Sequence, residues 1–355
     1  MEAFIRGIGN ISPQPTFDND VFLEEICEYQ ISRLKSTGPD YKNYIQPNQL
    51  RRMSRLLKMG VTAAGICLHD AGVEKPDAII TGTGMGMMEE TEKFLNGLLD
   101  NGEKLLNPTA FIQSTHNTVG AHIAVMLGCN NYNLTYVHGP VSLEYALLDT
   151  LMRLEEIPSD KVLLGGVDEM TDAHFIITDS MGFWKKSGLS NLDLLKDKSP
   201  GTISGEGAAF FLLGKEEHPN NYARIRGLSM RFNPDKQAVA VDHTVEFLAA
   251  NELKNTDIDL VILGLNGDPG QDAVYDPVIR LFEEKSSLAF YKHLSGEHYL
   301  ASSFALWLAA KIMKSGEVPA IVRLERSKNP GKINNILICN HYKNIHHSLI
   351  LVSSC

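Results

Sequence analysis

The junction around His138 is the most informative place in this sequence for chemistry. A strand-like run ends at Val137, His138 is followed by Gly139 and Pro140, and a helical pattern begins at Val141. Proline suits the first turn of a helix, where its missing N–H would have no partner. A side chain at such a turn can face the open end of a sheet, where the N–H groups of the helix start stabilise negative charge. His138 is therefore a candidate catalytic group, although taken alone it is better explained as a packed, hydrogen-bonded histidine.

Two glycine-rich turns are further candidates for a pocket. The first, Thr81–Gly86, follows a strand-like run, but its glycines miss the GxGxxG spacing of a dinucleotide site and it lacks the lysine of a P-loop. The second, Gly205–Ala208, contains Glu206 and opens an apolar run, which is typical of a turn with a buried carboxylate. Tight turning of the backbone explains both segments without a ligand.

The other histidines give no recognisable metal-binding pattern. His341, His346 and His347 are close in sequence but lack a known ligand spacing. His293 and His298 bracket a Ser-Gly-Glu turn just before a long helical pattern, where the serine can act as a helix cap. We therefore expect neither a metal nor a cofactor.

Alternating strands and helices must position these residues. Apolar runs predict strands at 3–8, 78–80, 133–137, 162–164, 208–213, 222–225, 261–263, 335–339 and 348–352. Helical patterns cover 49–71, 119–127, 141–154, 244–250, 272–284 and 298–314. This alternation predicts an α/β protein whose largely parallel strands are covered by helices on both faces.

Composition and charge limit the classes of function. The chain has 355 residues, 43 acidic and 33 basic, and a net charge of −10, so we expect neither nucleic acid nor an anionic membrane as a partner. Its five cysteines form no CxxC pair, and its first residues do not resemble a signal peptide. Since no apolar run is long enough to span a bilayer, the sequence predicts a cytoplasmic location.

In their order along the chain, these junctions resemble the β-ketoacyl-ACP synthases. The segments that carry the resemblance are Gly7–Pro13, Thr81–Gly86, Asn107-Pro108 with Asn117 and Gly120, Tyr132–His138, Gly165–Glu169 and Gly205–Ala208. They span most of residues 1–213. The resemblance weakens beyond that point, although Lys292 and the Ser295-Gly296 turn still fit.

The resemblance implies a thiolase-like α/β fold and, usually, a dimer. The family has two similar βαβαβαββ halves in an α-β-α-β-α layered arrangement. We expect these halves at residues 1–214 and 215–355, because the polar, turn-rich segment 214–221 lies between two predicted strands.

The catalytic residue types of the family are absent from the matching positions. The family uses a cysteine nucleophile at a helix N-terminus and two histidines that support malonyl decarboxylation. Here the cysteine position falls on His138, and the two histidine positions fall on Asn266 and Glu297. Lys292, which precedes the second position, is retained. His298 is one residue beyond it, and the uncertain register of residues 260–300 keeps His298 open as an alternative.

Three hypotheses follow from this substitution pattern. The first is a non-condensing subunit of fatty-acid or polyketide (aryl-polyene type) biosynthesis, which resembles a chain-length factor, binds acyl chains and pairs with an active ketosynthase. The second is an acyltransferase or thioesterase-like enzyme in which His138 acts as a general base on acyl-ACP or acyl-CoA, with Glu297 or His298 as its partner. The third is a scaffold protein whose pocket is filled. Either a homodimer or a heterodimer fits the first hypothesis.

A basic stripe offers one sequence signal for a partner. Arg51 and Arg52, with Arg55 and Lys58 on the following turns, form this stripe in an otherwise acidic chain. The related segment of the family meets the acidic acyl carrier protein. An ordinary solvated helix face explains the same pattern equally well.

Overall fold

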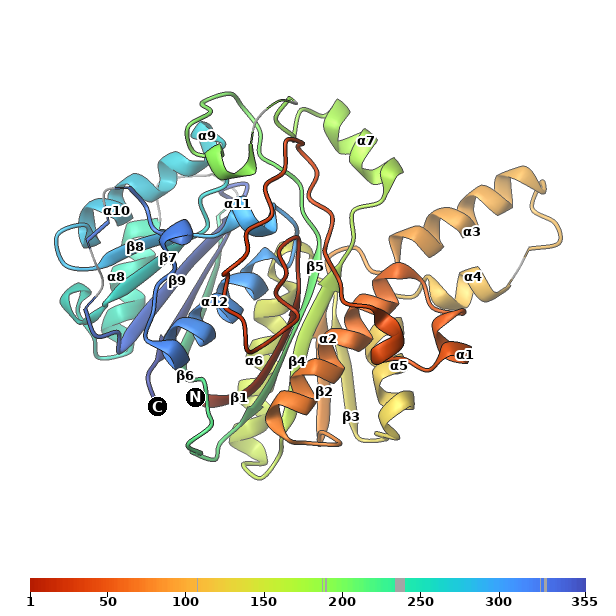
Figure 1. Cartoon of the computed structure of the whole chain (residues 1–355), viewed down its shortest axis with the longest axis horizontal. Coiled ribbons are helices and arrows are strands. Elements are labelled where there is room, and N and C mark those ends of the chain that lie inside the picture. The colour runs from red at the N-terminus through yellow and green to blue at the C-terminus, as the bar shows by residue number, and fades with distance from the viewer. Residues whose placement is uncertain (107, 187, 189, 234–239, 326, 329–330) are drawn as a thin grey trace.

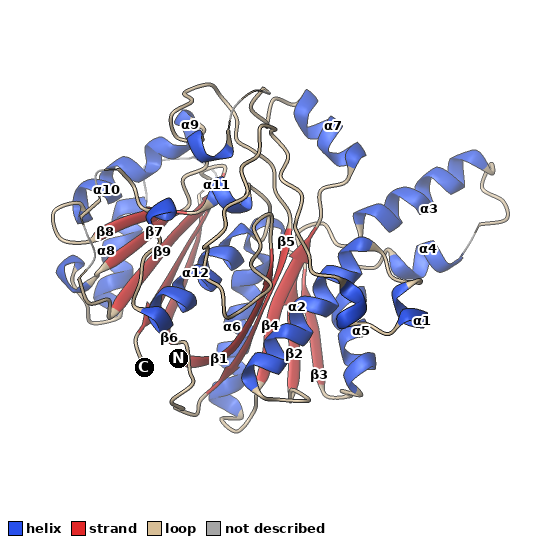
Figure 2. Ribbon diagram, in the orientation of Figure 1, coloured by secondary structure: helices blue, strands red, loops and turns tan. Residues whose placement is uncertain are grey.

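A computed structural model describes residues 1–106, 108–186, 188, 190–233, 240–325, 327–328 and 331–355. Asn107, which belongs to one of the family-like motifs, lies outside the described residues. Figures 1 and 2 show strands at the centre of the molecule and helices around and between them. The N- and C-termini lie near each other, close to the start of the central strand β1 (Figure 1).

The chain order of the elements alternates strands with helices, as the sequence predicts. The strands are β1 (Ala3–Ile11), β2 (Ala78–Gly82), β3 (Tyr132–Tyr136), β4 (Val162–Asp168), β5 (Gly207–Gly214), β6 (Ala223–Phe232), β7 (Leu260–Leu263), β8 (Ser287–Phe290), β9 (Asn335–Tyr342) and β10 (His346–Ser353). The helices are α1 (Pro47–Leu50), α2 (Arg55–Ala71), α3 (Met88–Asp100), α4 (Pro108–Gln113), α5 (Thr118–Leu127), α6 (Ser142–Glu156), α7 (Asp172–Ser180), α8 (Ala240–Ala250), α9 (Pro269–Asp272), α10 (Asp276–Phe282), α11 (Lys292–Ser295) and α12 (Ala301–Ser315). Short 3₁₀ turns lie at Tyr41–Asn43, Gly139–Val141, Asn191–Asp193, Asn255–Asp257, Ala273–Tyr275 and Ala320–Val322.

The strand order reveals two halves with the same topology. The strands lie in the order β3-β2-β4-β5-β1-β6-β10-β9-β7-β8. Read from the other edge, the second half runs β8-β7-β9-β10-β6, which repeats the order of the first half. The halves join where β1 pairs with β6, with Ala3 opposite Ile225. The division into separate units at residues 214 and 215 stays a prediction.

The sheet is mixed, whereas the sequence predicted largely parallel strands. β2 runs parallel to β3 and β4, and β7 runs parallel to β8 and β9. The pairs β1–β5, β1–β6, β4–β5, β6–β10 and β9–β10 are antiparallel. β10 follows β9 after a short turn, and so short a connection permits only antiparallel pairing.

Neighbouring side chains along each strand pack against helices on opposite faces, which gives the α-β-α-β-α layered arrangement. Ile79 of β2 packs in a cluster with α2 and α5, whereas Ala78 and Ile80 pack in the central cluster with α6 and α12. In the second half, Val261 packs in a separate cluster with α8 and α10, and Ile262 packs in the central one. Since neighbouring strand residues face opposite sides, helices cover both faces of each half. The predicted thiolase-like α/β fold is confirmed, with α6 and α12 as the middle layer.

Several elements differ from the sequence prediction. The helix expected at 49–71 is interrupted, because Ser54 caps α2 by accepting a hydrogen bond from the Leu57 N–H at 3.3 Å. The helix expected at 272–284 consists of a 3₁₀ turn followed by α10. Helices α3, α4 and α7 and strand β8 were not predicted. β8 has only four residues, which is too short for a periodic signal.

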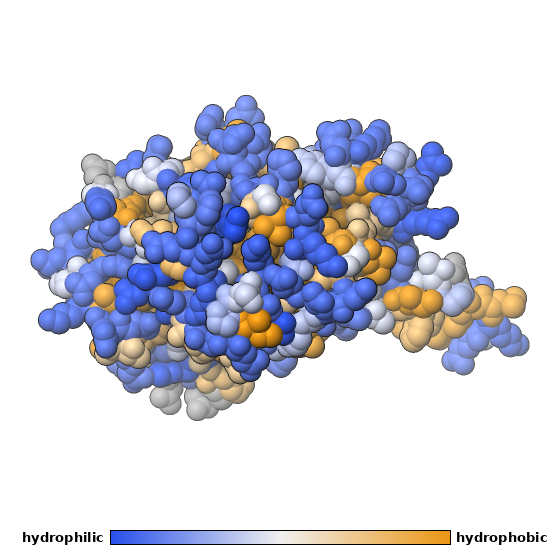
Figure 3. Space-filling model, turned by 90° about the horizontal axis from the view of Figure 1, so that it is seen from below, coloured by the Kyte–Doolittle hydropathy of each residue, from blue (hydrophilic) through white to orange (hydrophobic). Residues whose placement is uncertain are grey.

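Helices α3 and α4 form an arm that projects from the side of the molecule where β3 lies (Figure 1). The rings of Phe94 and Phe111 hold the two helices together, with centroids 5.2 Å apart. The exposed apolar side chains of the arm are Leu95, Leu99, Leu105, Phe111 and Ile112. Figure 3 shows this arm as a largely apolar protrusion. Exposed apolar surface of this extent is typical of a protein–protein contact.

The described residues include no helix that is both long enough and apolar enough to cross a membrane. All five cysteines are free, and three of them, Cys67, Cys129 and Cys339, are buried.

Candidate functional site

Three of the predicted site residues meet in a buried ion-pair cluster. Lys292 Nζ lies 2.8 Å from Glu297 Oε2, and Asn266 Nδ2 donates to the same oxygen at 3.0 Å. Lys292 also donates to the carbonyl of His341 at 3.1 Å. Lys292, Asn266 and Glu297 are all at most 5% exposed. The positions that resemble the family's two histidines are therefore occupied by a linked amide and carboxylate.

Close approach of two glycines positions Glu297. The N–H of Glu297 donates to the carbonyl of Ile203 at 2.8 Å, and the N–H of Gly205 donates to the carbonyl of Glu297 at 3.0 Å. Gly296 has a φ of 68°, and a Cβ on Gly205 would overlap the carbonyl oxygen of Ser295. Only glycine tolerates both this conformation and this contact. The Gly205–Ala208 motif therefore holds the segment that presents Glu297.

Asn266 is fixed by the turn that follows β7. Its N–H donates to Asp272 at 2.9 Å, and the N–H of Gly267 donates to the other oxygen of Asp272 at 2.8 Å. Burial raises the pKa of Asp272 to about 6, and these two hydrogen bonds oppose the rise. Asp268 caps α9 through the N–H groups of Gly270 and Gln271. The side chain of Asn266 is thus held rigidly toward Glu297.

His298 lies beside this cluster in an inner cavity of about 40 Å³. Burial, together with the nearby charge of Lys292, lowers the pKa of His298 to about 3, so the ring is neutral at pH 7. Its Nδ1 has no hydrogen-bond partner among the described residues. The cavity has room for about one water molecule. A weakly basic imidazole in so small a space is poorly suited to accept a proton from a substrate.

Two carboxyl groups, buried Asp168 and half-buried Glu169, also line the inner cavity. Burial raises the pKa of Asp168 to about 6, although Asp168 accepts hydrogen bonds from Thr83 and from the N–H of Gly84. Burial raises the pKa of Glu169 to about 7. The turn Thr81–Gly86 is therefore tied to the end of β4, with no sign of a phosphate-binding role.

His138 does not join the cluster. Its ring is exposed and packs on Tyr145 at 4.6 Å and on Tyr136 at 6.1 Å between centroids. Its N–H donates to Ser142 Oγ at 2.8 Å. Neither cavity in contact with Glu297 has His138 in its wall. His138, which the sequence resemblance places at the nucleophile position, thus belongs to an aromatic group beside edge strand β3.

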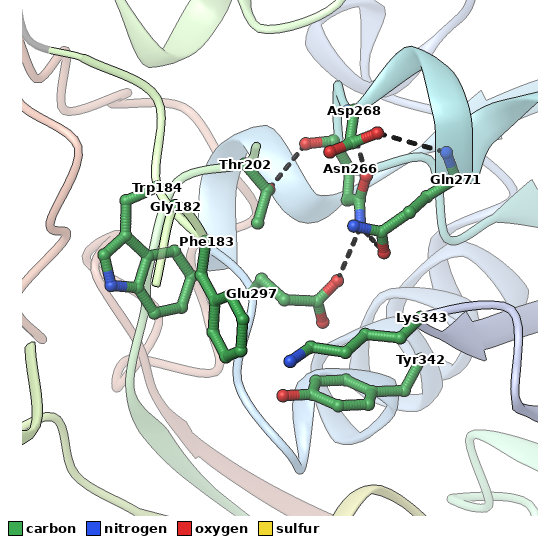
Figure 4. A pocket seen from close by; sticks show the side chains of 10 residues that line it. All are labelled: Gly182, Phe183, Trp184, Thr202, Asn266, Asp268, Gln271, Glu297, Tyr342 and Lys343. Atoms are coloured by element: carbon green, nitrogen blue, oxygen red, sulfur yellow. Dashed lines mark hydrogen bonds between the residues drawn. The ribbon is translucent and has the colours of Figure 1, made fainter. Parts of the chain in front are cut away.

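An outer cavity of about 190 Å³ opens above the ion-pair cluster. Its wall is formed by Gly182, Phe183, Trp184, Thr202, Asn266, Asp268, Gln271, Glu297, Tyr342 and Lys343 (Figure 4). Its wall combines several polar side chains with the aromatic rings of Phe183, Trp184 and Tyr342, as in many small-molecule sites. Sequence reasoning missed Phe183 and Trp184, because they lie in a polar stretch without periodicity. Tyr342 is the last residue of β9, and Lys343 lies in the turn between β9 and β10.

Bulky side chains separate the outer cavity from the inner one. Phe183, Trp184, Glu297 and Tyr342 line both. Tyr299 packs 5.1 Å from Tyr342 between ring centroids, and a Cβ on Gly84 would overlap Tyr299. The interior beyond Glu297 is therefore largely filled.

The predicted basic stripe does not form on one helix face. Arg51 and Arg52 are exposed after α1, whereas Arg55 turns inward and pairs with Glu206 through both carboxylate oxygens, one of them at 2.9 Å. Glu206 is 1% exposed, which confirms the buried carboxylate expected in the Gly205–Ala208 turn. Among the described residues, no group of three or more His, Cys, Asp or Glu side chains is arranged to hold a metal ion.

Comparison with known families supports the resemblance to the ketosynthases. Residues 30–185 match the family model described as "Beta-ketoacyl synthase, N-terminal domain". A comparison with curated proteins gives no match. The resemblance inferred from the motifs is thus confirmed for this part of the chain.

Solved structures with the same fold extend the likeness to the whole chain. "The ishigamide ketosynthase/chain length factor" superposes with a TM-score of 0.80 and 16% identity, and the alignment covers 100% of this chain and 99% of that one. A β-ketoacyl synthase from Burkholderia phymatum STM815 gives 0.78 and 15%, with the same coverage. A third structure, the type II polyketide synthase acyl-carrier protein in complex with its ketosynthase (AntDE:AntF), gives 0.76 and 16% at 100% and 99% coverage.

Proposed function

We propose that this ketosynthase-like chain is a non-condensing subunit that resembles a chain-length factor and pairs with an active ketosynthase in polyketide or fatty-acid biosynthesis. The observation that carries the proposal is the Lys292–Glu297 ion pair, with Glu297 at a position where the family has a catalytic histidine. Decarboxylation of a malonyl thioester develops negative charge on an enolate, and a carboxylate beside it would oppose that charge.

The position of His138 supports the same conclusion. A nucleophile must reach the acyl carbon, and the helix start must stabilise the resulting oxyanion. His138 instead packs against Tyr145 at the molecular edge and lines neither cavity beside Glu297. Among the described residues, neither cavity beside Glu297 brings together a cysteine and two histidines, which supports a non-condensing role.

The open edge of β3 supports pairing with a second ketosynthase-like subunit. β3 has a strand partner on one side only, and its exposed residues include Tyr132 and Leu134. The opposite edge strand, β8, is covered, because Leu288 exchanges hydrogen bonds with Leu324 and Ser327. An unprotected edge strand beside exposed apolar residues is a template for association. The solved structure described as a ketosynthase/chain length factor makes an active ketosynthase the preferred partner.

An acyl carrier protein is the second proposed partner. One of the structural relatives is a ketosynthase in complex with its acyl-carrier protein. Arg51 and Arg52 are exposed and adjacent in this otherwise acidic chain. Basic side chains of this kind attract an acidic protein and raise the rate of association.

Condensation assays test the proposal. The purified chain is incubated with acyl-ACP and malonyl-ACP, first alone and then with an intact ketosynthase from the same genome. We expect no product from the chain alone, and products of altered chain length when both proteins are present. Condensed product from the chain alone would overturn the proposal.

The filled interior favours a scaffold as the second candidate. Tyr299 and Tyr342 occupy the space beyond Glu297 and leave an inner cavity of only about 40 Å³. A scaffold would still bind the ketosynthase but would leave the product length unchanged, so the same assay separates the two candidates. An acyltransferase or thioesterase using His138 remains a hypothesis, and it requires His138→Ala to abolish turnover of acyl thioesters.

A further inference from the structure

β1 and β6 occupy equivalent positions in the two halves of the sheet. They pair antiparallel with Phe4 opposite Arg224, and a two-fold rotation at this point exchanges the two strands. The register of each strand with its other neighbour is interrupted once, at Arg6 in β1 and at Arg226 in β6. These irregularities lie at corresponding places, so the repeat of the two halves extends to single residues.

The glycines that follow these irregularities confirm the equivalence. A Cβ on Gly7 would overlap the end of α2, and a Cβ on Gly227 would overlap Asn251, which directly follows α8. Each glycine thus allows a helix end to approach its strand closely. The next residues, Ile8 and Leu228, are therefore equivalent, and their surroundings in the two halves can be compared directly.

In the first half, the open edge of β1 is covered by the chain itself. The pairing of β1 with β6 ends before Ile8, so the backbone of Ile8 needs other partners. Its N–H donates to Asp70 of α2 at 2.9 Å, and its carbonyl accepts a hydrogen bond from Asn19 Nδ2 at 2.7 Å. We call residues 17–26 the covering segment. It completes the edge that β6 leaves open.

The covering segment also packs on the middle layer. The ring of Phe22 lies 5.9 Å from that of Trp307 in α12, between centroids. Lys311 Nζ donates to the carbonyl of Asn19 and lies 5.4 Å from the centroid of Phe22. Figure 1 shows this segment, in red, in front of α12. Since the covering segment carries four carboxylates, it combines acidic groups with an aromatic anchor.

In the second half, the equivalent place is an open groove of about 400 Å³. Leu148 and Leu151 of α6 form one wall, and Phe247 of α8 forms the other. β6 lies between them, with Leu228 in the wall of the groove. This groove therefore has the place relative to α6, β6 and α8 that the covering segment has relative to α12, β1 and α2.

The backbone of Leu228 presents its polar groups to this groove. Along an antiparallel strand, the N–H and carbonyl groups of successive residues point to alternate sides. The N–H of Asn233 donates to the carbonyl of Ile345 on the side of β10, so the N–H and carbonyl of Leu228 point away from β10. Among the described residues, no side chain bonds to either group. The groove thus offers one donor and one acceptor to a ligand.

The charged groups of the groove favour an acidic ligand. Arg226 and Arg231 line it, together with the single carboxylate of Glu246. Arg231 pairs with Glu246 at 2.7 Å, whereas Arg226 donates to the carbonyl of Asn251 at 3.3 Å. The cationic charge of Arg226 is therefore not neutralised by this carboxylate. In a chain with a net charge of −10, such a groove attracts carboxylates selectively.

We propose that this groove binds an acidic segment of a partner protein that carries an aromatic side chain, in the way in which the first half holds its own covering segment. The aromatic ring packs on Leu148 and Leu151, a polar group of the ligand pairs with the backbone of Leu228, and carboxylates lie near Arg226. The described residues that line the groove include none that line the cavities beside Glu297, so this inference goes beyond the proposed function and does not depend on it.

Hydrogen exchange tests the open edge without a ligand. Mass spectrometry with residue-level fragmentation compares the amides of Ile8 and Leu228. We expect the Leu228 amide to exchange at least about tenfold faster, because Asp70 holds the amide of Ile8 and no described group holds that of Leu228. Equal protection of the two amides would show that the edge of β6 is already occupied, and would overturn the proposal.

A labelled peptide with the sequence of residues 17–26 is the probe for binding, because its chemistry fits the equivalent place in the first half. Fluorescence polarisation should show saturable binding to the parent protein. We expect Leu148→Asp to weaken this binding about tenfold, since it removes the apolar wall and repels carboxylates. Val245→Asp, at a 50% exposed position on α8 outside the groove, is the matched control and should leave the affinity unchanged.

Further measurements locate the peptide and identify what it needs. A peptide with Phe22→Ser should bind about tenfold more weakly. Added peptide should slow exchange of the Leu228 amide and leave that of Ile8 unchanged. Thermal melts must show that Leu148→Asp folds like the parent protein.

Two results would overturn the proposal. The first is the absence of saturable binding, or binding that a folded Leu148→Asp variant retains in full. The second is self-association of the parent protein, measured by light scattering without peptide, that Leu148→Asp abolishes. That result would make a second copy of this chain the occupant of the groove.

Discussion

At the scale of single residues, the buried carboxylate of Glu297 is the centre of the proposed account. Asn266 and Lys292 both direct their donors to one oxygen of Glu297. A buried carboxylate needs such compensation, because burial without a partner is costly. Both donors are therefore engaged by Glu297. On the proposed function, this ion pair is structural and not catalytic.

Removal of one partner of this ion pair should be strongly destabilising. We expect Lys292→Met to lower the free energy of unfolding by about 3–5 kcal/mol, since it leaves Glu297 buried without its cation. The double variant Lys292→Met/Glu297→Leu should recover most of this loss. Urea denaturation measures both, with Lys104→Met on the exposed arm as a control. A loss below about 1 kcal/mol for the single variant would show that the pair is not a structural element.

Glu169 should make stability depend on pH in a defined window. Burial raises its pKa from 4.5 to about 7, so its protonated form is favoured in the folded protein. The stability it contributes is complete below about pH 4.5 and is lost as the pH rises through 7. Glu169→Gln removes this titration, so the variant should gain about 3 kcal/mol relative to the parent between pH 4.5 and 8. Urea denaturation at several pH values measures the free energy of unfolding of both proteins. If the two free energies change with pH in parallel, the prediction is wrong.

At the scale of elements, the sequence predicted the strands better than the helices. Buried strands such as β4 are continuous apolar runs, and these are visible in the sequence. Helices α3 and α7 each bury only one residue, and the apolar side of α3 faces solvent or α4, so neither shows the pattern of a helix that packs on the sheet. Asn266, Glu297 and Lys292, which the motifs singled out, lie in contact with one another, and their role stays a prediction. The motifs did not predict that His138 faces outward, because that depends on how β3 ends at the edge of the sheet.

The connection between α1 and α2 should contribute to carrier-protein binding. Arg51 and Arg52 are exposed there, whereas Arg55 is engaged with Glu206. Reversal of both exposed charges, Arg51→Glu/Arg52→Glu, should weaken binding of an acyl carrier protein about tenfold at low salt. Surface plasmon resonance measures the affinity. Lys254→Glu/Lys332→Glu changes the charge equally on exposed positions of the other half, and an equal loss in this control would reject a specific role for Arg51 and Arg52.

At the scale of the whole molecule, one side carries a cluster of exposed apolar residues. The α3–α4 arm and the open edge of β3 lie on this side (Figure 1), and Val125 of α5 is 81% exposed. Clustering of such residues beside an unpaired strand indicates an interface with another subunit. His138 follows the end of this strand and packs on Tyr145 of α6, so a partner on the β3 edge would lie beside both.

A charge on β3 should prevent this assembly. Leu134 is 39% exposed on the edge strand, so Leu134→Arg should abolish the complex with an intact ketosynthase by placing an unpaired charge in the contact. Val245→Arg, at a 50% exposed position on α8, is the matched control and should leave assembly unchanged. Size-exclusion chromatography with light scattering gives the mass of the complex. Normal assembly of the Leu134 variant would place the interface elsewhere.

Decarboxylation of malonyl-ACP is the most direct test of the central claim, because it isolates the step that the Glu297 carboxylate opposes. Release of labelled carbon dioxide is measured for the purified chain alone and for an intact ketosynthase as the positive control. We expect the chain alone to give only the uncatalysed rate, in the parent protein and in Glu297→Gln and His138→Ala alike. If the parent chain releases carbon dioxide faster than the uncatalysed rate, and either substitution reduces this release, the non-condensing role is contradicted.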